Sequence, residues 1–188
     1  MAAKKSKLSG GVKRLGSDKL LAALNTQVGS ELHASHQYTS IAAHFDAENL
    51  PRLAAFFYRQ SDEERMHAMK FVRHIVDLGG RVKVPAIASP LSEFATAEEA
   101  VALSLQWEHT VTGQIYDLVD IAKGDRDYIS MRFLDWFVSE QLEEINTMET
   151  LLSLVQRAGE DNLLLVEDYI GENQIGDGGG GGEKHEKD

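Results

Sequence analysis

Four long stretches of the sequence repeat their apolar residues at the spacing of an α-helix. In the first stretch, Leu20, Leu24, Val28 and Leu32 recur every four residues. The stretches cover about 17–46, 49–80, 96–124 and 125–159. At about 1.5 Å per residue each would form a helix of roughly 40–50 Å. Such helices bury their apolar stripes against one another, so the pattern favours a helical bundle.

Short polar residues and a proline mark where these helices should begin. Ser17 is a plausible N-cap of the first helix, and Asn49 of the second. Pro51 suits the first turn of the second helix. Thr96 can cap the third, and Glu99, three residues later, can complete a capping box. The fourth helix is expected to begin near residue 125.

The connections predict the topology. Tight joins make antiparallel hairpins of helices one and two, and of helices three and four. Residues 79–95, GGRVKVPAIASPLSEFA, have no strong period and are long enough to cross the bundle. Residues 162–170, NLLLVEDYI, predict a short fifth helix. The predicted fold class is all-α, a four-helix bundle with one long crossover between helices two and three and a short fifth C-terminal helix.

The two ends of the chain differ in composition from the body. Residues 1–16 are basic and residues 172–188 contain a glycine run, so both are predicted to be flexible tails around one domain, 17–171. The net charge of −11 suits attraction of cations and argues against a nucleic-acid-binding body. Cysteine is absent, which excludes disulfides and iron–sulfur clusters.

The expected location is cytoplasmic. No apolar run approaches the roughly 18 residues of a membrane span, so no membrane partner is expected. The N-terminus has lysines without the apolar region of a secretory signal.

Polar and acidic side chains fall on the apolar stripe of every long helix. They are Glu31 and Tyr38 in the first helix, Glu64 and His67 in the second, Glu108 in the third, and Glu140, Gln141 and Glu144 in the fourth. Any one of them alone is more typical of a wet helix face or a satisfied core residue. Together they would place several like charges in a dry core, which is costly unless cations neutralise them. Oxygen ligands with one imidazole suit iron or manganese, and a bridging glutamate suits two-metal chemistry.

Four motifs on the four predicted helices resemble those of the ferritins, specifically the bacterial non-haem type. They are ELHASHQY (31–38), DEERMH (62–67), QWEHTVT (106–112) and FLDWFVSEQLEE (133–144). They occur in the order of that family, and the resemblance covers roughly residues 18–171.

The resemblance implies a di-iron ferroxidase centre within each subunit. The first iron would be held by Glu31, Glu64 and His67. The second would be held by Glu64 as a bridge, Glu108 and Glu144, with Gln141 nearby. Tyr38 would hydrogen-bond at the site, where it can donate an electron. A third iron site is implied at Glu63, Glu140 and Glu143, which Glu144 could share.

The resemblance also implies the reaction and the assembly. Fe(II) would be oxidised by dioxygen or peroxide, and ferric mineral would be stored in a hollow, octahedral shell of 24 copies. The fifth helix would line its four-fold axes. Haem is not expected, because Arg65 stands where the haem-ligating methionine of bacterioferritins would fall. Met66 is adjacent but lies about 100° around the helix.

The sequence is also compatible with other functions. The basic residues 1–16, displayed many times on a shell, could bind DNA through its phosphates, giving a DNA-associated iron-detoxifying shell. A soluble di-iron oxidase that stores no mineral is another alternative. A purely structural bundle would not explain inward glutamates on four helices.

Overall fold

The helices of the computed structural model follow the sequence pattern closely. The model describes residues 14–173 and 175, so most of the two predicted tails lies outside the described residues. The helices are α1 (Asp18–Ala47), α2 (Pro51–Asp77), α3 (Ala97–Gly124), α4 (Tyr128–Ala158), the 3-10 turn η1 (Glu160–Asn162) and α5 (Leu163–Asn173). The predicted all-α fold with four long helices and a short fifth is confirmed. None of the described helices combines the length and apolar character needed to cross a membrane.

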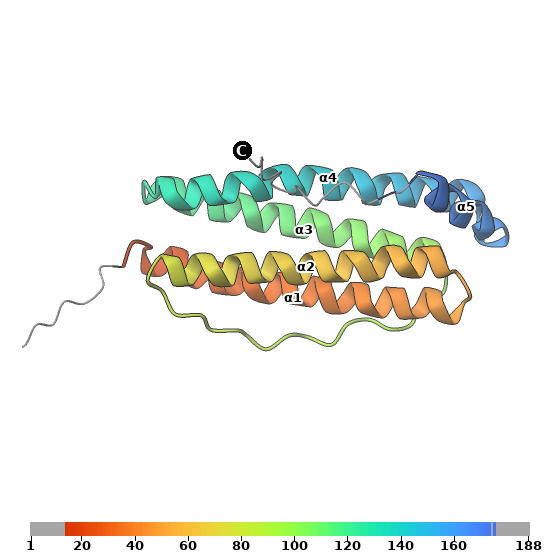
Figure 1. Ribbon diagram of the computed structural model, residues 1–188, viewed down its shortest axis with the longest axis horizontal. Coiled ribbons are helices and arrows are strands. Elements are labelled where there is room, and N and C mark those ends of the chain that lie inside the picture. The colour runs from red at the N-terminus through yellow and green to blue at the C-terminus, as the bar shows by residue number, and fades with distance from the viewer. Residues whose placement is uncertain (1–13, 174, 176–188) are drawn as a thin grey trace, which may run out of the picture.

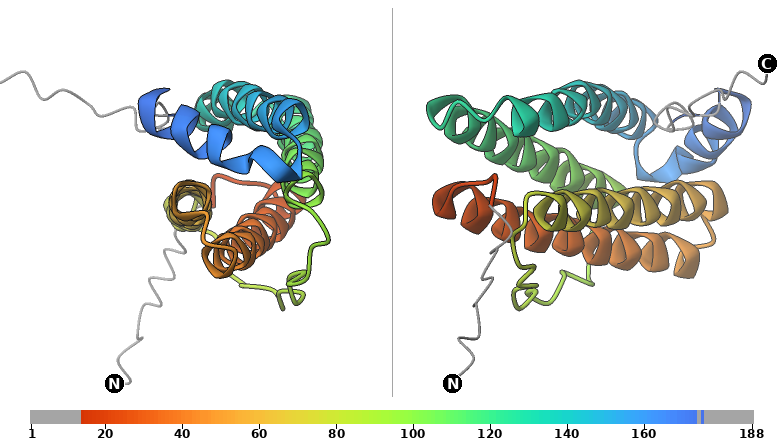
Figure 2. Two further views of the ribbon diagram at one scale, coloured as in Figure 1. Left: turned by 90° about the vertical axis from the view of Figure 1, so that its right-hand side faces the viewer. Right: turned by 60° about the vertical axis from the view of Figure 1, so that its left-hand side comes forward.

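The long helices form two hairpins joined by a crossover. Figure 1 shows α1 beside α2 and α3 beside α4, with the extended segment after α2 running along the outside of the bundle. Gln37 on α1 holds this segment, because its amide both donates to and accepts from the Leu91 backbone at 2.9 Å. Figure 2 shows α5 lying across one end of the bundle. The topology is the one predicted.

The starts of α1 and α3 are predicted correctly from their capping residues. The Ser17 and Thr96 hydroxyls accept from the backbone N–H groups of Leu20 and Glu99, both at 3.0 Å, so both predicted caps are confirmed. The Glu99 carboxylate accepts from the N–H of Ala95 at 2.7 Å, one residue before the capping-box position.

Two predicted starts are wrong. Asn49 does not cap α2. It has φ 59°, in the left-handed region, and Leu50 is the N-cap without a side-chain hydrogen bond. The fourth helix begins at Tyr128, capped by Asp127, because residue 126 adopts φ 56° and extends the turn. Both misses arise where a left-handed residue lengthens a tight hairpin connection.

The core consists of two apolar clusters with a polar layer between them. One cluster includes Phe45, Phe57 and Met148, near the end that carries α5. The other includes Leu24 and Phe71, near the opposite end. Along each long helix the predicted acidic residues lie between positions of the two clusters. The bundle therefore seals the polar layer from both ends.

Candidate metal centre

The predicted site residues on the helix stripes are buried in this layer. Exposed fractions are 1% for Glu31, 2% for Glu64, 1% for His67, 0% for Glu108, 6% for Glu140, 3% for Gln141 and 6% for Glu144. Tyr38 is fully buried as well. Helical periodicity alone predicts this burial, because each residue shares a stripe with core residues of its own helix.

One group of possible metal ligands combines Glu31, Glu64 and His67. One ligand atom from each lies within 4.8 Å of the others. His67 follows Glu64 by one turn of α2, which places Nδ1 3.5 Å from Glu64 Oε2. Within residues 14–173 and 175, neither Glu31 Oε2 nor Glu64 Oε2 accepts a hydrogen bond. Buried carboxylate oxygens without donors are expensive, so a cation would stabilise them.

A second group shares the same histidine. Ligand atoms of His67, Glu140 and Glu144 also lie within 4.8 Å of one another. His67 Nε2 lies 3.7 Å from Glu140 Oε1. The two ring nitrogens thus lie beside carboxylates of different helices, Nδ1 beside Glu64 of α2 and Nε2 beside Glu140 of α4. Trp136 and Phe137 contact the ring edge-on, with centroids 5.4 and 5.7 Å away, and shield it.

Glu108 on α3 lies in neither group, and other side chains donate hydrogen bonds to both of its oxygens. Tyr38 donates its hydroxyl hydrogen to Oε1, and Gln141 donates from Nε2 to Oε2 at 3.2 Å. The same Gln141 nitrogen lies 3.2 Å from the hydroxyl of Thr112. The carboxylate is therefore fixed in orientation by residues from α1 and α4.

Burial and mutual repulsion raise the pKa of the carboxylates. Burial followed by the charge of Glu64 raises the pKa of Glu31 well above its ordinary value. Burial followed by the charge of Glu108 does the same to the pKa of Glu64 and of Glu144. Burial also raises the pKa of Glu108, although the hydrogen bonds from Tyr38 and Gln141 oppose it. A metal ion bound in this layer would compete with protons for these carboxylates.

The pKa of His67 is raised, although burial alone would lower it. Contact with Glu140 and the charges of Glu31 and Glu144 outweigh the effect of burial. The Tyr38 pKa is raised well above its ordinary value by burial and then by the charge of Glu108. Tyr38 therefore remains a hydrogen-bond donor at neutral pH.

The residues predicted for a third iron do not form a ligand group of their own among the described residues. Glu140 belongs to the second group. Glu63 is partly buried, accepts a hydrogen bond from Gln60, and has a pKa raised by burial. Glu143 is exposed and belongs to neither group of ligands found among the described residues. The third site stays a prediction.

Gln27 belongs to this layer, although the sequence motifs did not indicate it. It is 3% exposed and donates from Nε2 to Glu31 Oε1 at 2.9 Å. The signal that could have found it is its position one turn before Glu31 on the same stripe of α1.

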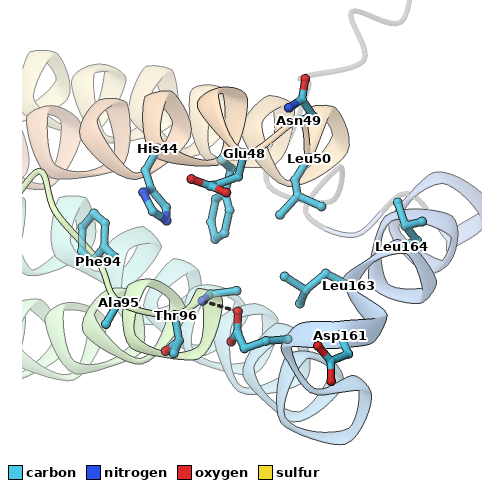
Figure 3. A pocket seen from close by; sticks show the side chains of 13 residues that line it. His44, Glu48, Asn49, Leu50, Phe94, Ala95, Thr96, Asp161, Leu163 and Leu164 are labelled. Carbon is cyan, nitrogen blue, oxygen red and sulfur yellow. Dashed lines mark hydrogen bonds between the residues drawn. The ribbon is translucent and has the colours of Figure 1, made fainter.

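A pocket of about 530 Å³ lies elsewhere, at the end of the bundle that carries α5. Figure 3 shows His44, Phe94 and Leu163 around it, from α1, the crossover and α5. Glu160 accepts the N–H of Ala97 there at 3.1 Å and caps α3. None of the lining residues is a predicted ligand, so this pocket is separate from the buried layer.

The donor set selects the chemistry. Carboxylates with one imidazole and no sulfur suit iron or manganese in preference to softer metals.

A family model for the ferritin-like domain matches residues 21–158. The chain belongs to the ferritin family.

Known ferritins resemble the chain over most of its length. The Mycobacterium tuberculosis ferritin BfrB is 40% identical over 152 residues, 81% of this chain and 83% of that protein. A Staphylococcus aureus bacterial non-heme ferritin is 38% identical over 160 residues, 85% of this chain and 95% of that protein. Among solved structures, an open pore ferritin from Archaeoglobus fulgidus has a TM-score of 0.81 and 32% identity, covering 84% of this chain and 98% of that one. The resemblance to bacterial ferritins inferred from the motifs is confirmed.

Proposed function

We propose that this ferritin oxidises Fe(II) at a di-iron centre inside each subunit and stores the ferric product within a hollow shell. Membership of the family supports iron storage. The observation that carries the finer proposal is the pair of buried, carboxylate-rich ligand groups that adjoin at His67. Two adjoining groups of this kind suit a pair of metal ions close together, with a carboxylate as the bridge, because a neutral imidazole ligates one ion.

Each ligand has a role in the proposed centre. Glu31, Glu64 and His67 hold the first Fe(II), with Glu64 as the bridge. Glu144 and Glu108 hold the second, and Gln141 and Tyr38 orient Glu108. Glu63, Glu140 and Glu143 would hold a further iron beside the pair. Fe(II) would compete with protons for the carboxylates as it binds, because their pKa values are raised in its absence.

The reaction is a transfer of electrons from iron to the oxidant. Two Fe(II) lose one electron each, which reduces one dioxygen to peroxide or one peroxide to water. Buried apolar residues on both sides of the layer keep bulk water from the centre. Tyr38 would supply an electron only where dioxygen is reduced beyond peroxide; its hydrogen bond to Glu108 supports a role beside the second iron.

The decisive experiment compares aerobic Fe(II) oxidation by metal-free wild type and Glu64→Ala at about two irons per subunit, the ratio of a two-metal centre. We expect fast oxidation by the wild type and a collapse of the rate in the variant. Glu149→Ala, at an exposed position of α4, is the matched control and should keep the wild-type rate. Equal, slow oxidation by all three proteins would refute the centre.

The proposed assembly is a shell of 24 copies. Leu164 and Leu165 on α5 are 71% and 65% exposed, which leaves an apolar face for contact with other copies. Mass measurement in solution and electron microscopy test the shell. A particle of 24 subunits supports storage, whereas a small oligomer favours a di-iron oxidase that stores no mineral.

A DNA-associated shell is the second candidate, favoured by the basic residues of segment 1–16. DNA retardation that is strongly salt-dependent and lost on deletion of this segment would support it. Absence of retardation at low salt would refute it.

A further inference from the structure

Gln27 is an uncharged residue of the buried layer that has no place in the proposed centre. Its amide nitrogen donates to Glu31 Oε1 at 2.9 Å from one helical turn away. Both residues are almost completely buried, at 3% and 1% exposure. A hydrogen bond to a buried carboxylate in this setting is strong and geometrically specific.

This hydrogen bond distinguishes the two oxygens of Glu31. Oε1 is engaged by Gln27, whereas Oε2 accepts no hydrogen bond from the described part of the chain. A glutamate carboxylate rotates readily about its last torsion, because that torsion has broad wells. The Gln27 amide restricts this rotation and leaves Oε2 as the oxygen free to meet a cation beside Glu64 and His67.

The other side of Gln27 faces a surface pocket. A pocket of about 270 Å³ between α1 and α3, here called the α1–α3 pocket, is lined by Ala23, Thr26, Gln27, Gln114, Asp117, Leu118 and Ile121. Thr26 and Asp117 in this lining are exposed to solvent. The Gln27 side chain therefore stands between a solvent-exposed pocket and the Glu31 carboxylate.

We propose that Gln27 is a positioning residue, which holds Glu31 so that Oε2 is presented to the first metal ion and separates that carboxylate from the α1–α3 pocket. The inference rests on the proposed metal centre and assigns a role to a residue outside its ligand set. Partners that orient metal ligands commonly affect affinity strongly, with about a 10–100-fold loss when they are removed.

The test is a Co(II) titration of the metal-free assembled protein, followed by calorimetry and by the visible absorption of Co(II). Gln27→Met keeps an unbranched side chain of similar length and removes the donor. We expect the affinity for the first Co(II) per subunit to fall by about 10-fold or more. The visible spectrum at saturation should also change, since Glu31 is then free to rotate about its last torsion.

Gln114→Met is the matched control, because it makes the same substitution on the α3 side of the same pocket. We expect wild-type affinity and spectrum from it. Melting of the metal-free variants checks folding, and Gln27→Leu repeats the test with another shape. Wild-type affinity and spectrum in both folded Gln27 variants, or an equal loss in Gln114→Met, would overturn the role of Gln27.

The titration separates this inference from the proposed function. Loss of Co(II) binding in Glu64→Ala with no change in Gln27→Met would overturn the positioning role alone. Absence of saturable Co(II) binding by the wild type would overturn the metal centre, and the positioning role with it.

Discussion

Tyr38 on α1 donates its hydroxyl hydrogen to the Glu108 carboxylate on α3, joining two residues that are 70 positions apart in the sequence. Both side chains are fully buried. The bond holds one oxygen of Glu108 while Gln141 holds the other. It also opposes the effect of burial on Glu108, because a hydrogen bond to the ionised form lowers the pKa. Tyr38, which the sequence motifs predict to hydrogen-bond at the site, therefore orients a proposed iron ligand and favours its ionised form.

Replacing Tyr38 by phenylalanine should destabilise the metal-free protein and slow Fe(II) oxidation. The variant leaves Glu108 Oε1 without a donor, which costs about 1–3 kcal/mol in a buried setting. The melting temperature should fall by roughly 2–4 °C for each kcal/mol in a chain of this size. Oxidation should slow because Glu108 then holds its proton more tightly. Calorimetry and stopped-flow absorbance measure the two effects.

The matched control for this substitution is Tyr128→Phe. Tyr128 is 65% exposed at the start of α4, so loss of its hydroxyl should change neither melting nor oxidation. If Tyr38→Phe behaves like this control, the hydrogen bond to Glu108 contributes nothing measurable.

The raised carboxylate pKa values predict how the metal-free protein responds to pH. An unfolded glutamate releases its proton near pH 4.5, whereas folded Glu64 holds its proton to higher pH. Above about pH 4.5 the folded chain therefore binds more protons than the unfolded chain, and the free energy of unfolding falls as pH rises through the folded pKa. The raised pKa of His67 acts in the same direction. Glu64→Gln should make this decline shallower.

Calorimetry of chelator-treated protein from about pH 5 to 8 tests the slope, because this range lies above the ordinary carboxyl pKa. At neutral pH the Glu64→Gln variant should melt above the wild type, by about 2–4 °C for each kcal/mol of relieved repulsion. The exposed Glu149→Gln variant should follow the wild-type curve. Parallel curves for all three proteins would show that Glu64 is not held protonated in the fold.

The burial of the layer is predictable from the sequence because it depends on local geometry. Four glutamates lie three or four residues from apolar residues of their own stripe: Glu31, Glu64, Glu108 and Glu144. The helical repeat therefore turns each glutamate and its apolar neighbours toward the core together. Glu143 shows the same rule in reverse. It lies about 100° from Glu144 around α4 and is exposed.

Contacts between distant segments could not be predicted in this way. The sequence favours Asn49 as the cap of α2, but the carboxylate of Glu167 on α5 meets this helix start instead. The separation of 115 residues hides the pair from any local pattern. The two oxygens of Glu108 are likewise engaged by residues from two other helices. Gln27 combines the two situations. Its burial follows from its position on the stripe of α1, whereas its hydrogen bond to Glu31 could not be predicted from the sequence.

Glu167 should determine whether α5 stays docked on the bundle. Its buried carboxylate accepts from the backbone N–H groups of Arg52 at 2.9 Å and Leu53 at 2.8 Å. Glu167→Ala removes this cap, and losing a helix cap costs about 0.5–2 kcal/mol. We expect faster hydrogen exchange and earlier proteolysis in α5, while the four long helices keep their protection.

Asp168→Ala is the matched control for the docking of α5. Asp168 is the next residue of the same helix and is exposed, so its removal should leave exchange in α5 unchanged. Equal exchange rates in Glu167→Ala and wild type would mean that the buried Val166 and Ile170 hold α5 without the cap.

Two helical glycines should respond in opposite ways to alanine because their surroundings differ. A Cβ at Gly29 on α1 would lie 2.3 Å from Pro85 Cγ in the crossover, whereas a Cβ at Gly113 on α3 would meet nothing within 4 Å. Alanine in a helix gains up to about 1 kcal/mol over glycine, and overpacking costs typically about 1–3 kcal/mol. Gly113→Ala should therefore raise the melting temperature and Gly29→Ala should lower it. Exchange of the backbone amides around Pro85 should also accelerate in Gly29→Ala. A rise in melting temperature for both variants would show that the crossover moves aside from α1 at no cost.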